Sequence, residues 1–167
     1  MLPRPLGRGL NFKSNPALAD NKSMPFIKIW IHLIFSTKNR AHIITKDLKP
    51  KLLAHIRENA ESKKIYLDSV NCVSDHIHML VSLKGDQSIS KVTMLLKGES
   101  SYWVNNNKLS KLKFEWQDEF IAVSIGESAL TKVRKYISNQ EEHHKTRSFA
   151  EEYDEFIKVY GFEKLRG

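Results

Sequence analysis

The chain has 167 residues, of which 41% are hydrophobic and 28% are charged, and this composition is typical of a globular domain. A single cysteine excludes an internal disulfide framework and a cysteine-rich zinc site. The longest apolar run, residues 26–35, is interrupted by Lys28 and His32 and is shorter than the ~20 residues that span a bilayer. No secretory signal precedes it, so we expect a cytoplasmic protein. The net charge of +8 lies mainly in the N-terminal third, and it fits either a polyanionic partner such as nucleic acid or a basic protein without one.

The first 23 residues differ in composition from the rest of the chain. They contain three prolines and two glycines and show no hydrophobic period. Met24 then directly precedes a regular strand pattern. We interpret residues 1–23 as a tag or a disordered extension, and residues 24–167 as a single domain.

Hydrophobic periodicity divides this domain into short elements. Residues 26–36 alternate between apolar and polar positions, which predicts a strand with one face in the core. Residues 47–62 repeat apolar positions every four residues, which predicts an amphipathic helix. By the same reasoning the next elements are strands at 65–74 and 76–83, a helix at 88–106, a strand at 120–125, and helices at 128–142 and 148–160. Ser128 and Ser148 are the expected N-caps of the last two helices.

The order of the elements predicts the fold class. Strand, helix, two strands, helix and strand form the split β-α-β arrangement, an α+β fold with an antiparallel sheet and helices on one face. Two further helices follow at the C-terminal end. The other face of the sheet would then be free for a partner or a site.

The strand at 76–83 contains two histidines two residues apart. Strand alternation places Ile77 and Met79 in the core, so His76 and His78 point together to the opposite face. Two imidazoles on one face can bind a single divalent ion and leave coordination positions open, as a catalytic metal requires. Two half-exposed histidines without a metal would produce the same pattern.

A second set of polar residues lies in the helix predicted at 128–142. Tyr136 and Gln140 are four residues apart and so lie on one flank of the helix. A phenol oxygen can attack phosphorus when a metal polarises the phosphate, and a glutamine carbonyl is a neutral oxygen ligand. A partly buried tyrosine beside an exposed glutamine is the plainer interpretation. His143 and His144 follow two glutamates near the helix end, and we interpret them as solvated surface.

Together these two sets resemble a known family. The His-hydrophobic-His pair followed by Tyr-x-x-x-Gln on a helix resembles the single-tyrosine transposases of the insertion-sequence-200/605 type, which are HUH (His-hydrophobic-His) endonucleases. The resemblance runs from Met24 to about Phe162. Supporting stretches are Ile31–Phe35 with Lys38–Arg40, Asp75–Leu80, Trp116–Gln117, and Tyr136–Lys145.

The resemblance implies a ferredoxin-like fold, a homodimer, Mg²⁺ or Mn²⁺ as cofactor, and single-stranded DNA with hairpins as substrate. His76 and His78 would hold the metal, with Gln140 as the third protein ligand. Tyr136 would attack the scissile phosphate and keep the 5′-phosphate, which leaves a free 3′-OH. The resemblance adds that the tyrosine helix can dock on a partner subunit, so we expect composite sites with the histidines from one chain and Tyr136 and Gln140 from the other.

Basic and aromatic residues are candidates for DNA contacts. Lys38, Arg40, Lys91 and Lys97 are the candidates for the phosphate backbone. Trp30 and Trp103 are expected either to stack on unpaired bases or to pack in the core or a dimer.

Two alternatives to a mobile transposase remain open. One is a domesticated, repeat-associated tyrosine transposase with the same chemistry, which only the genomic surroundings would distinguish. The other is a non-catalytic nucleic-acid-binding module on a ferredoxin-like sheet.

Overall fold

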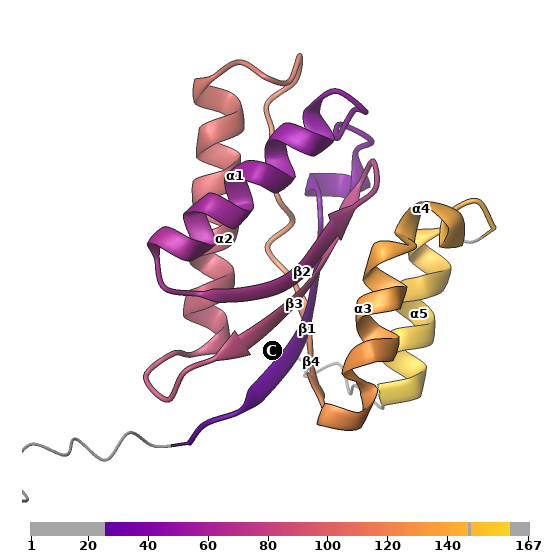
Figure 1. The fold of residues 1–167 in the computed structure, drawn as a ribbon. Helices are drawn as coiled ribbons and strands as arrows, with labels where there is room; N and C mark the ends of the chain where they lie inside the picture. The colour runs from indigo at the N-terminus through magenta and orange to yellow at the C-terminus, as the bar shows by residue number, and fades with distance from the viewer. Residues whose placement is uncertain (1–25, 147, 161–167) are drawn as a thin grey trace, which may run out of the picture.

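A four-stranded antiparallel sheet organises the chain (Figure 1). The computed structural model describes residues 26–146 and 148–160, the last five as backbone only. The strands β1 (Ile29–Ser36), β2 (Tyr66–Cys72), β3 (His76–Leu83) and β4 (Ile121–Ile125) are arranged in the order β2-β3-β1-β4. The expected ferredoxin-like α+β fold is therefore confirmed. The interpretation of residues 1–23 lies outside the described residues.

Helices α1 (Leu48–Ser62) and α2 (Ile89–Asn106) cover one face of the sheet (Figure 1). The apolar stripe of α1 is buried at the predicted four-residue spacing, with Leu52 fully inaccessible. Such a leucine contributes about 1.5–3 kcal/mol by leaving water. The alternate residues Leu33, Ile77 and Met79 meet these helices in the main core. The alternation of apolar and polar residues therefore predicted correctly which strand residues face the core.

A second helical layer covers the opposite face of the sheet (Figure 1). It consists of a 3₁₀ turn, η3 (Glu127–Ala129), and the helices α3 (Leu130–Ser138), α4 (Gln140–His143) and α5 (Phe149–Tyr160). Leu130 and Ile137 of α3 pack on Leu80 of β3, and Phe149 of α5 packs on β1 and β4. The expectation that this face is free was wrong, because the chain covers it with its own C-terminal helices.

The helix ends differ in part from the predictions. Ser148 caps α5 as expected, and its hydroxyl oxygen accepts from the Glu151 N–H at 3.4 Å. Ser128 does not cap α3, because it lies inside the 3₁₀ turn and α3 begins at Leu130. The helix predicted at 128–142 is also interrupted at Asn139, so Tyr136 and Gln140 lie on different helices.

Across the described part of the chain, no helix has both the length and the apolar character to cross a bilayer.

Candidate active site: a histidine–glutamate cluster beside Tyr136

His76 and His78 lie side by side on the face of β3 that α3 and α5 cover. Both side chains are fully buried, and their ring centroids are 5.1 Å apart. His76 Nδ1 lies 2.7 Å from Asp75 Oδ1, and His78 Nδ1 lies 3.1 Å from Nε2 of His32 on β1. With Nδ1 engaged in each case, the Nε2 atoms are the ones available to a ligand.

Two residues that the sequence analysis missed complete this group. His144, just after α4, places its Nε2 3.0 Å from His76 Nε2 and 3.0 Å from Glu152 Oε2. Glu152 of α5 is 5% exposed and places one carboxylate oxygen 3.5 Å from the Nε2 of each strand histidine. The ligand atoms of these four residues all lie within 4.8 Å of one another. We call His76, His78, His144 and Glu152 the histidine–glutamate cluster.

The position of His144 corrects one sequence interpretation. Of the adjacent histidines, His143 is exposed and stacks against Tyr136 at 4.9 Å between ring centroids. His144, just after α4, is instead half-buried and turned inward to the cluster. The pair is therefore not simply solvated surface.

Tyr136 of α3 lies against the cluster. Its ring packs edge-on against His78, with centroids 5.7 Å apart, and its hydroxyl donates to Glu152 Oε1. Gln140 is fully buried at the start of α4, with its amide nitrogen 3.5 Å from the Tyr136 carbonyl oxygen. The structure thus brings Tyr136 to the predicted histidines and buries Gln140 next to the tyrosine.

Burial and mutual contacts shift the protonation of the cluster. Burial lowers the pKa of His78, and burial with the neighbouring His78 lowers the pKa of His32 to about 3. Burial also lowers the pKa of His76, but the contacts of His76 with Asp75 and Glu152 outweigh burial, so the pKa of His76 is raised. Burial alone would raise the pKa of Glu152, yet the histidines lower it to about 2. At neutral pH Glu152 is therefore a carboxylate and His78 is neutral, which are the forms that bind metals.

A family comparison agrees with this geometry. The family model described as "Transposase IS200 like" matches residues 26–140, well over half of the chain. The chain belongs to the IS200-like transposase family. His76, His78, Tyr136 and Gln140 lie within the matched residues, whereas His144 and Glu152 follow them.

Individual relatives are transposases too. The chain is 26% identical over 137 residues to the transposase for insertion sequence element IS200 of Salmonella typhimurium, covering 77% of this chain and 88% of that one. It is 24% identical over 114 residues to the ISDra2 transposase TnpA of Deinococcus radiodurans, covering 65% and 81%.

Solved structures share the fold. A proposed transposase from Deinococcus radiodurans R1 has a TM-score of 0.56 at 20% identity, covering 70% of this chain and 93% of that one. A REP-associated tyrosine transposase bound to a REP hairpin has a TM-score of 0.55 at 18% identity, covering 72% and 70%.

The structure places the four candidate DNA-contact residues in different surroundings. Arg40 lies beside the site, with its guanidinium 5.2 Å from the ring centroid of Phe149 on α5. Lys38, on the 3₁₀ turn η2 (Lys38–Arg40), lies 3.7 Å from Asp118. Lys91 is exposed on α2, on the sheet face away from the histidine–glutamate cluster (Figure 1). Of these three residues, Arg40 therefore lies beside the site, and Lys91 lies on the other side of the sheet (Figure 1).

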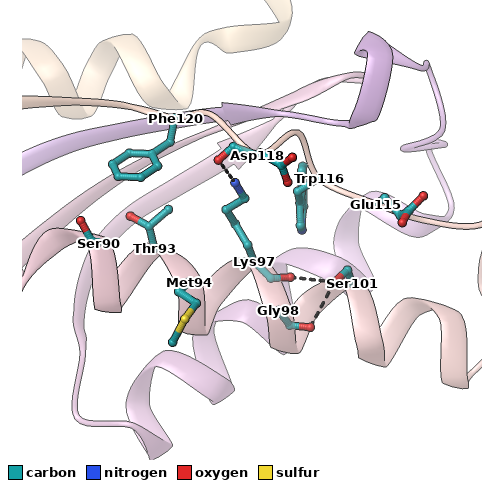
Figure 2. Close-up of a pocket in the computed structure, with 10 residues that line it drawn as sticks. All are labelled: Ser90, Thr93, Met94, Lys97, Gly98, Ser101, Glu115, Trp116, Asp118 and Phe120. Atoms are coloured by element: carbon teal, nitrogen blue, oxygen red, sulfur yellow. Dashed lines mark hydrogen bonds between the residues drawn. The ribbon is translucent and has the colours of Figure 1, made fainter. Parts of the chain in front are cut away.

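Lys97 is committed to another role. It points from α2 into a pocket of about 400 Å³ between α2 and residues 115–120, where its ammonium donates to the backbone oxygens of Gln117 and Asp118 (Figure 2). Burial lowers the pKa of Lys97 in this pocket. The lysine therefore fixes the segment before β4, and its charge is only partly available to a phosphate.

The two tryptophans named as candidates are half-buried and pack against neighbouring side chains. Trp103 stacks on His55 between α2 and α1, with ring centroids 4.2 Å apart. Trp30 packs beneath α3, with the Arg134 guanidinium 5.7 Å from its ring. Packing is thus the role that the structure gives both residues.

In the structure of the single chain, the tyrosine helix lies on the sheet of that same chain. Arg134 of α3 forms a bidentate pair with Asp68 of β2 at 2.8 and 2.9 Å, and Asn71 Nδ2 donates to the Ile137 and Ser138 carbonyl oxygens at 2.9 and 3.1 Å. We call Asp68, Asn71 and Arg134 the α3 anchor. Asp68 lies at an irregularity in the β2–β3 register, where the strand pairing shifts between Leu67 and Ser69. This anchor holds α3, and with it Tyr136, next to the histidines of the same chain.

Proposed function

We propose that this transposase cleaves and rejoins single-stranded DNA through a covalent intermediate on Tyr136. The tyrosine oxygen attacks the scissile phosphorus, the bond to the 3′-oxygen breaks, and that oxygen leaves as a free 3′-OH. The 5′-phosphate stays on Tyr136 as a phosphodiester. A second 3′-OH then attacks the same phosphorus and releases the tyrosine, so rejoining needs no nucleotide cofactor.

One observation carries this proposal: the Tyr136 hydroxyl lies at a buried group of metal-ligating side chains. It donates to Glu152, whose carboxylate is 3.5 Å from both strand histidines. Of the described tyrosines, Tyr66 and Tyr102 are exposed and Tyr153 packs on Phe149. A phenol beside metal ligands is the arrangement that phosphoryl transfer through tyrosine requires.

The donor atoms of the site fit a divalent cation, Mg²⁺ or Mn²⁺. His78 Nε2 and Gln140 Oε1 are buried and have no hydrogen-bond partner among the described residues. Such atoms are costly unless a ligand satisfies them. His76 and His78 would hold the cation with Gln140, and a bound cation would withdraw charge from the scissile phosphate as a Lewis acid. Asp75 and His32 keep the two rings oriented toward it.

The substrate and assembly follow from the family and from the charge of the chain. We propose hairpin-bearing single strands at the ends of an element as the substrate, contacted in part by Arg40, with the reaction taking place on chromosomal DNA in the cytoplasm. We also propose a homodimer, because transposition must hold two DNA ends and one tyrosine holds only one. Matched hairpins on either side of the gene would identify a mobile element, and their absence a domesticated copy.

The decisive experiment incubates the full chain with single-stranded DNA from its flanking genomic sequence and Mg²⁺ or Mn²⁺. We expect a covalent protein–DNA adduct in which mass spectrometry places the 5′-phosphate on Tyr136. Tyr136→Phe should form no adduct, whereas Tyr102→Phe and Tyr153→Phe should form it normally. His78→Ala should fold and bind DNA but cleave at least a hundredfold more slowly. An adduct on another tyrosine, or binding without cleavage by the wild-type protein, would refute the proposal and favour a non-catalytic DNA-binding module.

A further inference from the structure

We propose that Glu152 of α5 is a ligand of the divalent cation and also the residue that positions the Tyr136 hydroxyl beside it. This inference rests on the proposed function and deepens it. The family match ends at residue 140, so α5 contributes to the site from outside the matched region.

The two carboxylate oxygens of Glu152 face different groups. Oε1 accepts the Tyr136 hydroxyl and lies 3.5 Å from His78 Nε2. Oε2 lies 3.5 Å from His76 Nε2 and 3.0 Å from His144 Nε2, and it forms no hydrogen bond with the described residues. Neighbouring ligands around an ion with bonds of ~2.1 Å are about 3 Å apart, so these separations suit one shared cation.

The burial of Glu152 supports the same role. A carboxylate that is 5% exposed is costly unless a positive charge or several donors compensate for it. The ion pairs that Glu152 forms with described residues all involve histidines. A divalent cation among these side chains would compensate the carboxylate charge. Among the side chains of the cluster, the carboxylate is the ligand type that suits Mn²⁺ and Mg²⁺.

The packing of α5 fixes where this carboxylate lies. Ser148 caps the helix, and Phe149, one turn before Glu152, stacks on the His76 ring with centroids 4.3 Å apart. Phe149 also packs with Ile34, Ile121 and Val123 against the sheet. Glu152 is therefore held at the site by the helix, without depending on its contact with Tyr136.

Metal binding without DNA provides the first test. Calorimetric titration of Mn²⁺ into the full chain should show affinity about tenfold or more weaker for Glu152→Gln than for wild type, by analogy with the loss of other residues around a metal. Asp154→Asn removes an equal charge from an exposed position on the same helix and should bind within twofold of wild type. Glu152→Asp keeps a carboxylate and should recover part of the affinity. Circular dichroism and thermal unfolding check that each variant is folded.

Cleavage kinetics test the positioning role. At saturating Mn²⁺, Glu152→Gln should lower kcat while the KM for DNA stays within twofold, because the tyrosine, and not the DNA, has lost its partner. Wild-type Mn²⁺ affinity in Glu152→Gln, together with its loss in His78→Ala, would overturn the role of Glu152 and leave the proposed function standing. No Mn²⁺ binding by the wild-type chain would overturn the metal site as a whole.

Discussion

At the scale of single residues, the orientation of the His76 and His78 imidazoles depends on neighbours outside the histidine–glutamate cluster. His32 Nε2 on β1 lies 3.1 Å from His78 Nδ1 on β3. In the same way, Asp75 Oδ1 lies 2.7 Å from His76 Nδ1. Because the pKa of His32 is lowered to about 3, this ring is neutral at neutral pH. Its effect on the site is therefore geometric.

Replacement of His32 should weaken metal binding without unfolding the chain. His32→Ala should lower Mn²⁺ affinity about tenfold, because the His78 ring loses the partner that fixes its Nδ1. His42→Ala removes an exposed histidine and is the matched control. Equal Mn²⁺ affinities by calorimetry would mean that packing alone orients His78.

Arg40 should account for one phosphate contact at the site. Arg40→Ala should reduce the slope of log K against log salt by about 0.7 for a single-stranded oligonucleotide, the value for one phosphate. Lys91→Ala, on the far layer of the sheet, should leave the slope unchanged. Fluorescence anisotropy over a range of salt concentrations measures both, and the reverse result would place the DNA path over α2.

At the scale of elements, the α3 anchor holds the helix that carries Tyr136 on the sheet of its own chain. The Asp68–Arg134 pair and the Asn71 hydrogen bonds join α3 to β2, and Lys49 of α1 pairs with Glu141 of α4. Gln140 follows a break at Asn139, so it reaches its buried position on a new helix and not along α3. These contacts hold Tyr136 and Gln140 beside the histidines of the same chain.

Mixing two inactive variants tests this assignment. His78→Ala and Tyr136→Phe, combined under conditions that allow subunits to exchange, should stay inactive because each site of a heterodimer keeps one defect. The covalent-adduct assay measures the outcome, with the double variant His78→Ala/Tyr136→Phe mixed with wild type as the control for exchange. Restored cleavage would show that α3 leaves its own sheet and docks on the partner subunit.

Acid should loosen the α3 anchor. The hydrogen bond from Arg134 holds the pKa of Asp68 below its usual 3.8. When folding lowers the pKa of a carboxyl group, the stabilisation from that group is complete at pH values above its usual pKa. The stabilisation is lost as the pH falls through the lowered pKa. Asp68→Asn should therefore lower the free energy of unfolding more at pH 6 than at pH 3. Urea unfolding at both pH values, with Asp86→Asn as an exposed control, measures the difference; equal effects at the two values would contradict the anchor.

At the scale of the molecule, the sheet separates a large core from two small ones. Leu33, Met79 and Leu96 belong to the main core beneath α1 and α2, whereas α3 and α5 rest on smaller apolar clusters. Stability should therefore differ between the layers, with the layer that carries the site opening more easily.

Truncation of Phe149 should expose this difference. Phe149→Ala should lower the free energy of unfolding of α5 by about 3 kcal/mol, since the ring is 8% exposed against β1 and β4. Hydrogen exchange should speed up in α5 and remain slow in α1 and α2. Leu112→Ala, at an exposed position, serves as the control. Uniform acceleration throughout the chain would indicate a single cooperative unit.

The sequence allowed the sheet and half of the site to be predicted. The alternation of apolar and polar residues in β1 and β3 predicted which side chains lie on each face of the sheet. The two-residue spacing of His76 and His78 predicted that their rings lie together. His144 and Glu152 join the site only because the chain after β4 folds back onto the sheet. His76 and His144, for example, are 68 residues apart in the sequence. No local period encodes such a contact. An acidic residue between Phe149 and Tyr153, on the apolar side of a helix, was the one available signal for Glu152.

The position of Trp30 beneath α3 provides an optical probe of the nucleophile. Trp103 and Trp116 lie in the main core on the other face of the sheet, so Trp30 is the only one of the three tryptophans that packs against the tyrosine helix. In a Trp103→Phe/Trp116→Phe background, the emission spectrum would come from Trp30 alone. Movement of α3 away from the sheet would expose that indole to water and shift its emission to longer wavelength. The helix could then be followed in real time by stopped-flow fluorescence, without an attached dye, as DNA binds, is cut and is released.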